Sequence, residues 1–161
     1  MEVALILKGI IFDTIANSPV VILKDPNADR YLPIWIGIFE AQAIALKLDN
    51  IVTPRPMTHD LLNNLLKDLS INVEKVVICD IKDNTYYAQI HLVKDDKKYI
   101  IDSRPSDAIA LAVRCDCKIY ANDEIMEKAK FFDMSSEGEE LEQLKKWLEE
   151  LDPEVLGKYK M

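Results

Sequence analysis

The chain has 161 residues, 49% of them hydrophobic and 30% charged, with a net charge of −8, a composition that excludes disordered and fibrous classes and indicates one folded domain. No apolar stretch reaches the roughly 18 to 20 residues that a membrane helix needs, and Glu2 and Lys8 are atypical of a signal peptide, so we expect a cytoplasmic protein without a membrane partner. The acidity argues against a nucleic-acid partner, but it is concentrated, since residues 1–121 carry 14 basic and 16 acidic side chains and residues 122–154 carry 4 and 12.

Residues 2–49 predict three strands followed by a helix. Runs of β-branched and apolar residues between polar breaks are typical of strands, and here the runs are Val3 to Phe12, Val20 to Leu23 and Tyr31 to Ile36. A helix over 39–48 follows. Its spacing places four side chains on a face that we expect to cover the sheet: Ala41, Ile44, Ala45 and Leu48.

A linking helix over about 58–69 is predicted next. Pro54 and Pro56 end the preceding segment, and Thr58 suits the N-cap position. The spacing predicts a buried side made of five leucines: Leu61, Leu62, Leu65, Leu66 and Leu69.

Residues 72–121 repeat the order of the first half. The predicted strands are Val73 to Ile81, Tyr86 to Val93 and Lys98 to Ile101, with a tight turn at Asp83-Asn84. A helix over 105–114 and a short strand at Lys118 to Ala121 follow, and Ala-Ile-Ala-Leu at 43–46 recurs at 108–111, an offset of 65 residues. The sequence therefore predicts an α+β fold built from two β-β-β-α copies, about 2–49 and 72–121, whose helices cover a mixed sheet.

Residues 122–161 predict an acidic helical extension of the same domain. Ser136 and Glu139 have the spacing of a capping box, and a stripe of apolar residues follows: Leu141, Leu144, Trp147, Leu148 and Leu151. We expect this stripe to dock on the core or on a second subunit, and exposed strand edges in a small sheet also favour a homodimer.

The three cysteines predict reduced thiols. They are Cys79, Cys115 and Cys117, and the Cys-Asp-Cys triplet lacks the further cysteines or histidines that would complete a zinc site.

The stretch from Asp102 to Asp107 gathers two carboxylates, two hydroxyls, a guanidinium and a proline before an apolar helix. A structural interpretation makes Ser103 the helix cap, places Pro105 in the first turn and pairs Arg104 with Asp102 or Asp107. A functional interpretation has the carboxylates hold a divalent cation, while Arg104 and free helix N–H groups receive a phosphate. Both stay open.

The two histidines and Glu40 are the remaining side chains to assign. His59 lies beside Asp60 at the start of the linking helix, so it is a general base, a metal ligand or a surface and capping residue. Glu40 in the first turn of its helix is a metal ligand or a favourable helix charge, whereas His91 in a strand faces solvent and has no predicted role. Phosphate-binding loops, dinucleotide glycine patterns, nucleophile elbows and HExxH motifs are missing from the sequence, which excludes those chemistries in their motif-bearing forms.

Four stretches within roughly residues 2–121 resemble the bifunctional nuclease family. They are LPIWIGIFEAQAIAL (32–46), RPMTHDLL (55–62), DNTYYAQIHL (83–92) and IDSRPSDAIALAVR (101–114). The resemblance implies a nuclease that acts on DNA and RNA with Mg²⁺ or Mn²⁺, and it adds Arg55 to the candidate residues.

The expected site follows from that resemblance. Asp102, Asp107 or Glu40 would hold the metal, which polarises the phosphate and generates hydroxide. The catalytic candidates are Asp102, Arg104, Asp107 and His59, and the substrate-binding candidates are Arg55, Ser103, Arg104 and Ser106. Two alternatives stay open: a non-catalytic binding or regulatory module for a small phosphorylated or carboxylated ligand or a protein partner, and an inert salt-linked turn in an oligomer.

Overall fold

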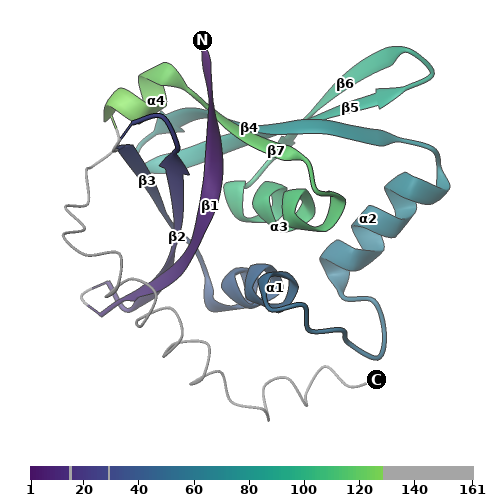
Figure 1. Ribbon diagram of the computed structural model, residues 1–161, viewed down its shortest axis with the longest axis horizontal. Helices are drawn as coiled ribbons and strands as arrows, with labels where there is room; N and C mark the ends of the chain where they lie inside the picture. Colours follow the sequence, from purple (N-terminus) through teal and green to yellow (C-terminus); the bar gives the residue numbers. More distant parts are fainter. Residues whose placement is uncertain (15, 29, 129–161) are drawn as a thin grey trace.

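The computed structural model describes residues 1–14, 16–28 and 30–128 (Figure 1). Its strands are β1 (Glu2–Asp13), β2 (Ser18–Asp25), β3 (Arg30–Trp35), β4 (Asn72–Lys82), β5 (Thr85–Lys94), β6 (Lys97–Ser103) and β7 (Lys118–Asn122). Its helices are α1 (Ile38–Leu48), α2 (Thr58–Asp68), α3 (Pro105–Cys115) and α4 (Asp123–Lys128). The predicted capping box at Ser136 and the apolar stripe after it lie outside the described residues.

The strands form one mixed sheet in the order β3-β2-β1-β7-β4-β5-β6. Within each half, three successive strands pair antiparallel, and a helix follows later in each half. β7 joins the halves, because it pairs antiparallel with β1 and parallel with β4. The predicted α+β class and the repeated β-β-β-α order are confirmed.

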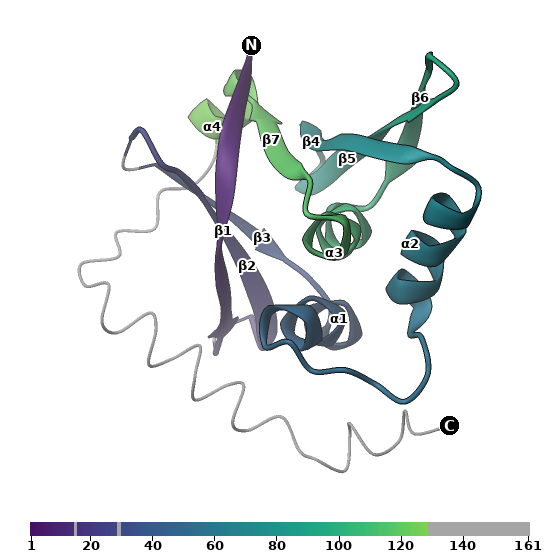
Figure 2. The same ribbon diagram turned by 45° about the vertical axis from the view of Figure 1, so that its right-hand side comes forward.

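β1 pairs with a different strand along each part of its length. Its residues 2–5 pair with β7, and its residues from 6 onward pair with β2. The register shifts between Leu7 and Gly9, and Gly9 has a φ of 150°, which residues with a side chain rarely adopt. The two meanders meet at a marked angle, with α1 and α3 in the space between them (Figure 2).

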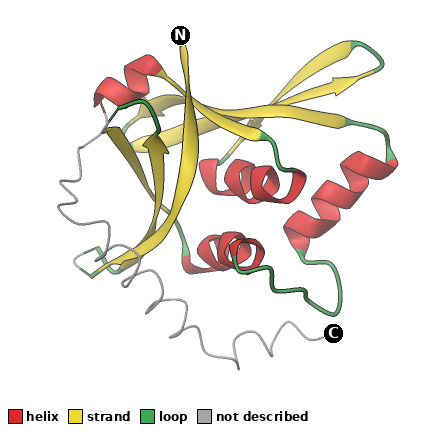
Figure 3. Ribbon diagram, viewed as in Figure 1, coloured by secondary structure: helices red, strands yellow, loops and turns green. Residues whose placement is uncertain are grey.

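α3 is the central helix of the core. Its residues from Ala108 to Ala112 are all buried, because α1 and α2 pack against it on one side and the strands β4 and β5 pack on the other. Three of those five residues are alanines, whose small side chains let neighbouring elements approach closely. The three long helices gather on the same face of the sheet (Figure 3).

Residues of α1 and α3 that are 65 positions apart match in burial as well as in sequence. The buried residues Ala41, Ile44 and Ala45 of α1 correspond to the buried residues Ser106, Ile109 and Ala110 of α3. Relative to that offset, α1 begins two residues earlier than α3. The two helix starts therefore differ in both sequence and position, although the helix bodies match.

The predicted buried side of α2 is wrong for three of its five leucines. Leu62 and Leu66 pack against the core, whereas Leu61, Leu65 and Leu69 are 50–54% exposed. The reason is that α2 packs mainly on α3 and less on β4, which together cover only a narrow strip of the helix.

The predicted buried face of α1 also extends too far toward the end of the helix. Leu48 is exposed rather than buried, because the buried stretch of α1 stops at Leu46 and the last turn extends past its neighbours.

The predicted helix caps are wrong by one residue. Met57, not Thr58, is the N-cap of α2, since the carboxylate of Asp60 accepts the backbone N–H of Met57 at 2.9 Å and fixes the start there. Arg104, not Ser103, is the N-cap of α3, and the Ser103 hydroxyl donates instead to the Arg104 carbonyl at 2.8 Å.

Two predictions from composition concern the described ranges. Cys79, Cys115 and Cys117 are free thiols there, as predicted. None of the described helices within residues 1–128 is both long enough and apolar enough to cross a membrane.

Candidate functional site

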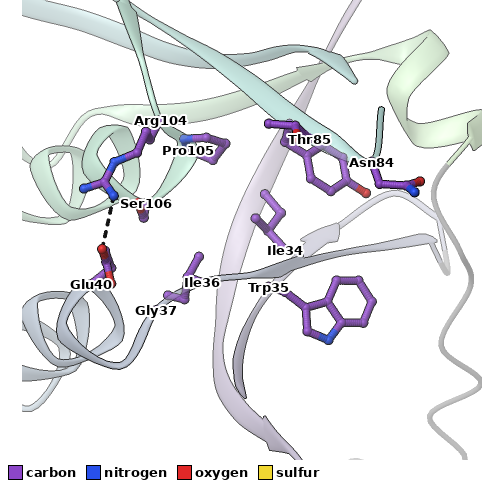
Figure 4. A pocket seen from close by; sticks show the side chains of 11 residues that line it. Ile34, Trp35, Ile36, Gly37, Glu40, Asn84, Thr85, Arg104, Pro105 and Ser106 are labelled. Carbon is purple, nitrogen blue, oxygen red and sulfur yellow. Dashed lines mark hydrogen bonds and ion pairs between the residues drawn. The ribbon is translucent and has the colours of Figure 1, made fainter. Parts of the chain in front are cut away.

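The first turns of α1 and α3, one from each half of the chain, are joined by an ion pair. Arg104 occupies the N-cap of α3, and Glu40 lies in the first turn of α1. Arg104 Nη1 donates to Glu40 Oε1 at 3.1 Å (Figure 4). The two residues are 64 positions apart in sequence, so the fold alone brings them together.

Arg104 also makes a two-point contact with Asp107. Its Nε donates to Oδ2 at 2.8 Å, and its Nη2 donates to Oδ1 at 3.1 Å. The hydrogen bond to Asp107 raises the pKa of Arg104 above its ordinary value, yet 64% of the side chain is exposed. The guanidinium is therefore a permanent positive charge that a ligand can reach.

Asp107 is shared between Arg104 and His59. His59 Nε2, at the start of α2, lies 2.9 Å from Asp107 Oδ1. Burial is the largest influence on the pKa of Asp107 and raises it, but the hydrogen bonds from Arg104 and His59 together hold that pKa below its ordinary value. Asp107 is thus an anion at neutral pH. The contact allows His59 to donate from Nε2 to Asp107, and in that tautomer Nδ1 is the basic atom.

A second network positions the start of α2. Arg114, in the last turn of α3 and only 4% exposed, donates from Nε to Asp60 Oδ1 at 2.6 Å. Its two Nη atoms donate to the carbonyls of Ala110 and Ala43 at 2.8 and 2.9 Å. The network ties all three long helices together and so fixes His59, the neighbour of Asp60. Sequence reasoning missed Arg114, although a single basic residue near the end of an apolar helix was the available signal.

A hollow of about 280 Å³ lies between α1 and the starts of α2 and α3. We name it the histidine-side hollow. Its lining includes Phe39, Gln42, Leu46, Met57, His59 and Asp107. It combines an apolar wall from α1 with the titratable pair at the starts of the other two helices.

A second hollow, of about 330 Å³, is lined by the same ion pair. We name it the tryptophan-side hollow, and its lining includes Ile34, Trp35, Asn84, Thr85, Pro105 and Ser106 (Figure 4). The predicted tight turn at Asp83-Asn84 is confirmed, with φ of 50° and 59°, and it brings Asn84 to this hollow. Glu40 and Arg104 line both hollows, so a ligand in either one meets the ion pair.

Gly37, the N-cap of α1, makes room for the Glu40 carboxylate. A Cβ atom at position 37 would collide with Glu40 Oε2. The backbone of Gly37, with φ −76° and ψ 163°, suits any residue. Glycine here therefore matters for the position of the Glu40 carboxylate and not for the backbone conformation.

The structure brings together four of the predicted site residues, which are Glu40, His59, Arg104 and Asp107. Ser106 lies beside them, buried, in the lining of the tryptophan-side hollow.

The other predicted residues lie elsewhere. Asp102 is exposed on β6, opposite Gln89 of β5. The pKa of Cys79 is raised mainly by burial, and the charge of Asp102 adds a smaller contribution. Arg55 is exposed in the loop before α2 and lines neither hollow. His91 lies 3.2 Å from Gln89 Oε1 in the sheet, away from the cluster.

The predicted metal ligands do not assemble into a cage. Glu40 and Asp107 both bond to Arg104, and Asp102 lies apart from them. Within residues 1–14, 16–28 and 30–128, no group of three or more His, Cys, Asp or Glu side chains is placed to hold a metal ion. The donors present do not fit a preformed Mg²⁺ or Mn²⁺ site, since the two nearest carboxylates are already engaged by a guanidinium.

Comparison with known families decides the affiliation of this chain. The model of the bifunctional nuclease domain matches residues 21–133. The chain belongs to the bifunctional nuclease domain family. The resemblance found in the sequence is thereby confirmed, and the matched segment contains the ion pair, the His59–Asp107 contact and both hollows.

Individual relatives fall into two groups. The "Uncharacterized protein Rv1829" of Mycobacterium tuberculosis is 36% identical over 155 residues, which cover 91% of this chain and 93% of that protein. "Bifunctional nuclease 1" of Oryza sativa subsp. japonica is 27% identical over 113 residues, or 68% of this chain and 34% of the rice protein. "Bifunctional nuclease 2" of Arabidopsis thaliana is 27% identical over 109 residues, or 66% and 33%. The chain thus spans about a third of these plant nucleases.

Proposed function

We propose that this chain hydrolyses phosphodiester bonds of DNA and RNA at the cluster of Glu40, His59, Arg104 and Asp107. The observation that carries the proposal is the continuous series of contacts from His59 through Asp107 to Arg104. The proposal is supported by the position of His59 in the lining of one hollow and of the exposed Arg104 guanidinium in the lining of both. The family supports the same chemistry, because its plant members bear the name of nucleases.

In the proposed reaction, His59 is the general base. Its basic nitrogen takes a proton from the attacking water as the water oxygen bonds to phosphorus. The bond from phosphorus to the leaving oxygen then breaks, and the imidazolium returns the proton to that oxygen. Asp107 holds the other ring nitrogen 2.9 Å away, which orients the ring and stabilises its charged form.

Arg104 receives the phosphate. Its side chain is largely exposed, and its contact with Glu40 is a single hydrogen bond of 3.1 Å at the surface. Such a contact contributes little, so a phosphate oxygen can replace it at low cost. The guanidinium then faces the charge that develops on the phosphate oxygens during attack.

A requirement for Mg²⁺ or Mn²⁺ stays a prediction. Mg²⁺ is often held by one or two carboxylates together with the phosphates of a substrate. Measuring cleavage with either ion and after chelation tests it, and activity that survives exhaustive chelation contradicts it.

Paired variants test the site assignment. We expect His59→Ala to lower the rate of oligonucleotide cleavage by about 10² to 10⁴, the usual contribution of a general base. His91→Ala is the matched control, because it removes the other histidine of the chain at a position outside both hollows. Its rate should equal that of the unchanged protein.

The same pair guards against contaminating nuclease. Contamination would persist in identically purified His59→Ala protein, whereas the proposed activity would not. If folded, unchanged protein leaves DNA and RNA strands intact with and without divalent cations, the proposal is wrong.

A second candidate is a binding module without cleavage. The observation that favours it is that Arg104 neutralises the two carboxylates nearest to it, a state suited to receiving an anion. Under this alternative, nucleotides or small carboxylates raise the melting temperature, while no substrate is cleaved.

A further inference from the structure

Gln42 of α1 is a buried amide with an unused hydrogen-bonding group. Its side chain is 4% exposed, and its Nε2 has no hydrogen-bond partner in the structure. An unpaired buried donor destabilises a fold, and such groups are rare in folded proteins. Gln42 also belongs to the lining of the histidine-side hollow. Its Nε2 is covered in the structure, so a ligand in the hollow reaches this donor when the side chain turns toward it.

Packing alone does not account for glutamine at this position. The neighbouring buried residues of α1 are Ala41, Ile44, Ala45 and Leu46, and an aliphatic side chain of similar length would leave no unpaired donor. The 65-residue offset pairs Gln42 with Asp107, which lines the same hollow from α3. Both copies thus present a polar side chain to one cavity.

The rest of the lining suits a flat, largely apolar ring. Ala43, Leu46 and Met57 supply aliphatic surface, and Phe39 lies at the rim with 68% of its surface exposed. A cavity of about 150 Å³ holds benzene, so the hollow of about 280 Å³ is large enough for a pyrimidine or purine base. An exposed aromatic ring beside such a cavity is able to stack on a base.

We infer that the histidine-side hollow binds one unpaired nucleobase of the substrate, whose edge hydrogen-bonds to the Gln42 amide and whose adjoining phosphate contacts Arg104. The inference rests on the proposed function and specifies its substrate. A carboxamide offers a donor and an acceptor side by side, which match the neighbouring acceptor and donor on the edge of a base. A base that is still paired and stacked in a duplex cannot enter a cavity without being extruded, so the site selects single strands.

The test measures binding separately from cleavage. A fluorescent single-stranded DNA oligonucleotide with phosphorothioate linkages keeps its charge and resists hydrolysis. Its affinity is measured by anisotropy and compared with that of the same strand carrying abasic residues and that of its duplex. We expect both comparison ligands to bind about tenfold more weakly. Equal affinities for all three would overturn the inference.

Gln42→Leu removes the amide and keeps the size of the side chain. We expect this variant to bind the single strand at least fivefold more weakly and to melt at a higher temperature than the unchanged protein. A residue whose role is only structural would not weaken binding while it raises stability. The matched control is Gln89→Leu on β5, outside both hollows, whose affinity should not change. Unchanged affinity in folded Gln42→Leu overturns the inference.

Phe39→Ala covers the case in which Gln42→Leu does not fold, because Phe39 is exposed and its removal leaves the core intact. We expect about tenfold weaker binding of the single strand, and unchanged affinity contradicts the inference. Base-dependent binding without cleavage would refute the proposed hydrolysis and leave the inference standing. Equal cleavage of single strands, duplexes and abasic strands would refute the inference and leave the hydrolysis standing.

Discussion

At the scale of single residues, the glycine at position 37 decides where the Glu40 carboxylate lies. Gly37→Ala adds one methyl group that collides with that carboxylate, while the backbone conformation suits alanine. We expect Glu40 to swing away and its ion pair with Arg104 to break. The loss of stability should stay on the order of 1 kcal/mol or less, because the pair is exposed.

A double-mutant cycle measures this effect. Gly37→Ala should lower the melting temperature when Glu40 is present and leave it unchanged in a Glu40→Ala background. Equal effects in both backgrounds would show that the methyl group acts on something other than the carboxylate.

Asp107 gives the site a defined response to acid. Its pKa in the folded protein lies below the ordinary value of 3.8, through its bonds to Arg104 and His59 and despite the opposing effect of burial. A carboxylate with a lowered pKa stabilises the fold above its ordinary pKa and loses that contribution as the pH falls through the folded value. We therefore expect Asp107→Asn to be less stable than the unchanged protein at pH 7.

The measurement is chemical denaturation of both proteins across a pH series. The difference in unfolding free energy, on the order of 1 kcal/mol after solvent screening, should be constant near neutral pH and shrink below pH 3.8. A difference that persists unchanged in strong acid would contradict the assignment of the stabilising contacts to the ionised carboxylate.

How much of the site the sequence predicts depends on the separation of its residues. The Arg104–Asp107 pair was one of the predicted alternatives, because residues three apart at a helix start are neighbours on its surface. His59 and Asp107 are 48 residues apart, so their contact needed the tertiary arrangement. The vacant donor of Gln42 had no sequence signal, since its position only looks like part of an apolar helix.

At the scale of elements, α3 is the helix on which the core depends. Ile109 is fully buried and belongs to the main hydrophobic core. We expect Ile109→Ala to destabilise the protein by about 2 to 5 kcal/mol, the range for truncating a large buried aliphatic side chain. Urea denaturation measures the change.

Leu65 on α2 provides the contrast for that prediction. It is half exposed, so Leu65→Ala should change stability by about 0.5 kcal/mol or less. A loss comparable to that of Ile109→Ala would show that α2 packs against something in solution that covers its leucine face.

The strands and helices were predictable where the apolar residues of a segment follow a single period, that of a strand or that of a helix. Alternating and β-branched runs located all seven described strands, and the repeated helix after each meander followed from its apolar spacing. The leucines of α2 were misjudged, because a helical period identifies a stripe but not how much of it neighbouring elements cover. Leu61, Leu65 and Leu69 belong to the stripe and still remain exposed.

At the scale of the whole molecule, charge limits how the proposed substrate binds. The chain has a net charge of −8, and Arg104 is the one Lys or Arg among the residues that line the two described hollows. Each phosphate neutralised on a single strand contributes a slope of about −0.7 to the logarithm of affinity against the logarithm of salt concentration. With one such contact, at Arg104, we expect a total slope of about −0.7.

Anisotropy titrations at several salt concentrations measure that slope, and Arg104→Ala should flatten it further. A slope steeper than about −3 would indicate several phosphate contacts and a basic surface other than the one around the hollows. The predicted homodimer stays a prediction. The exposed apolar residues of the edge strand β6, which are Tyr99, Ile100 and Ile101, are consistent with it.

The position of β7 has a consequence for how the protein is made on the ribosome. β7 is the last described strand in chain order, yet it lies in the middle of the sheet, between β1 of the first half and β4 of the second. During synthesis, the first meander and its helix emerge long before residues 118–122 leave the exit tunnel. Until then nothing in the sheet clamps the amino-terminal half to the carboxyl-terminal one. Because Glu40 comes from one half and Arg104 from the other, we expect their ion pair to persist only once β7 has joined the two meanders.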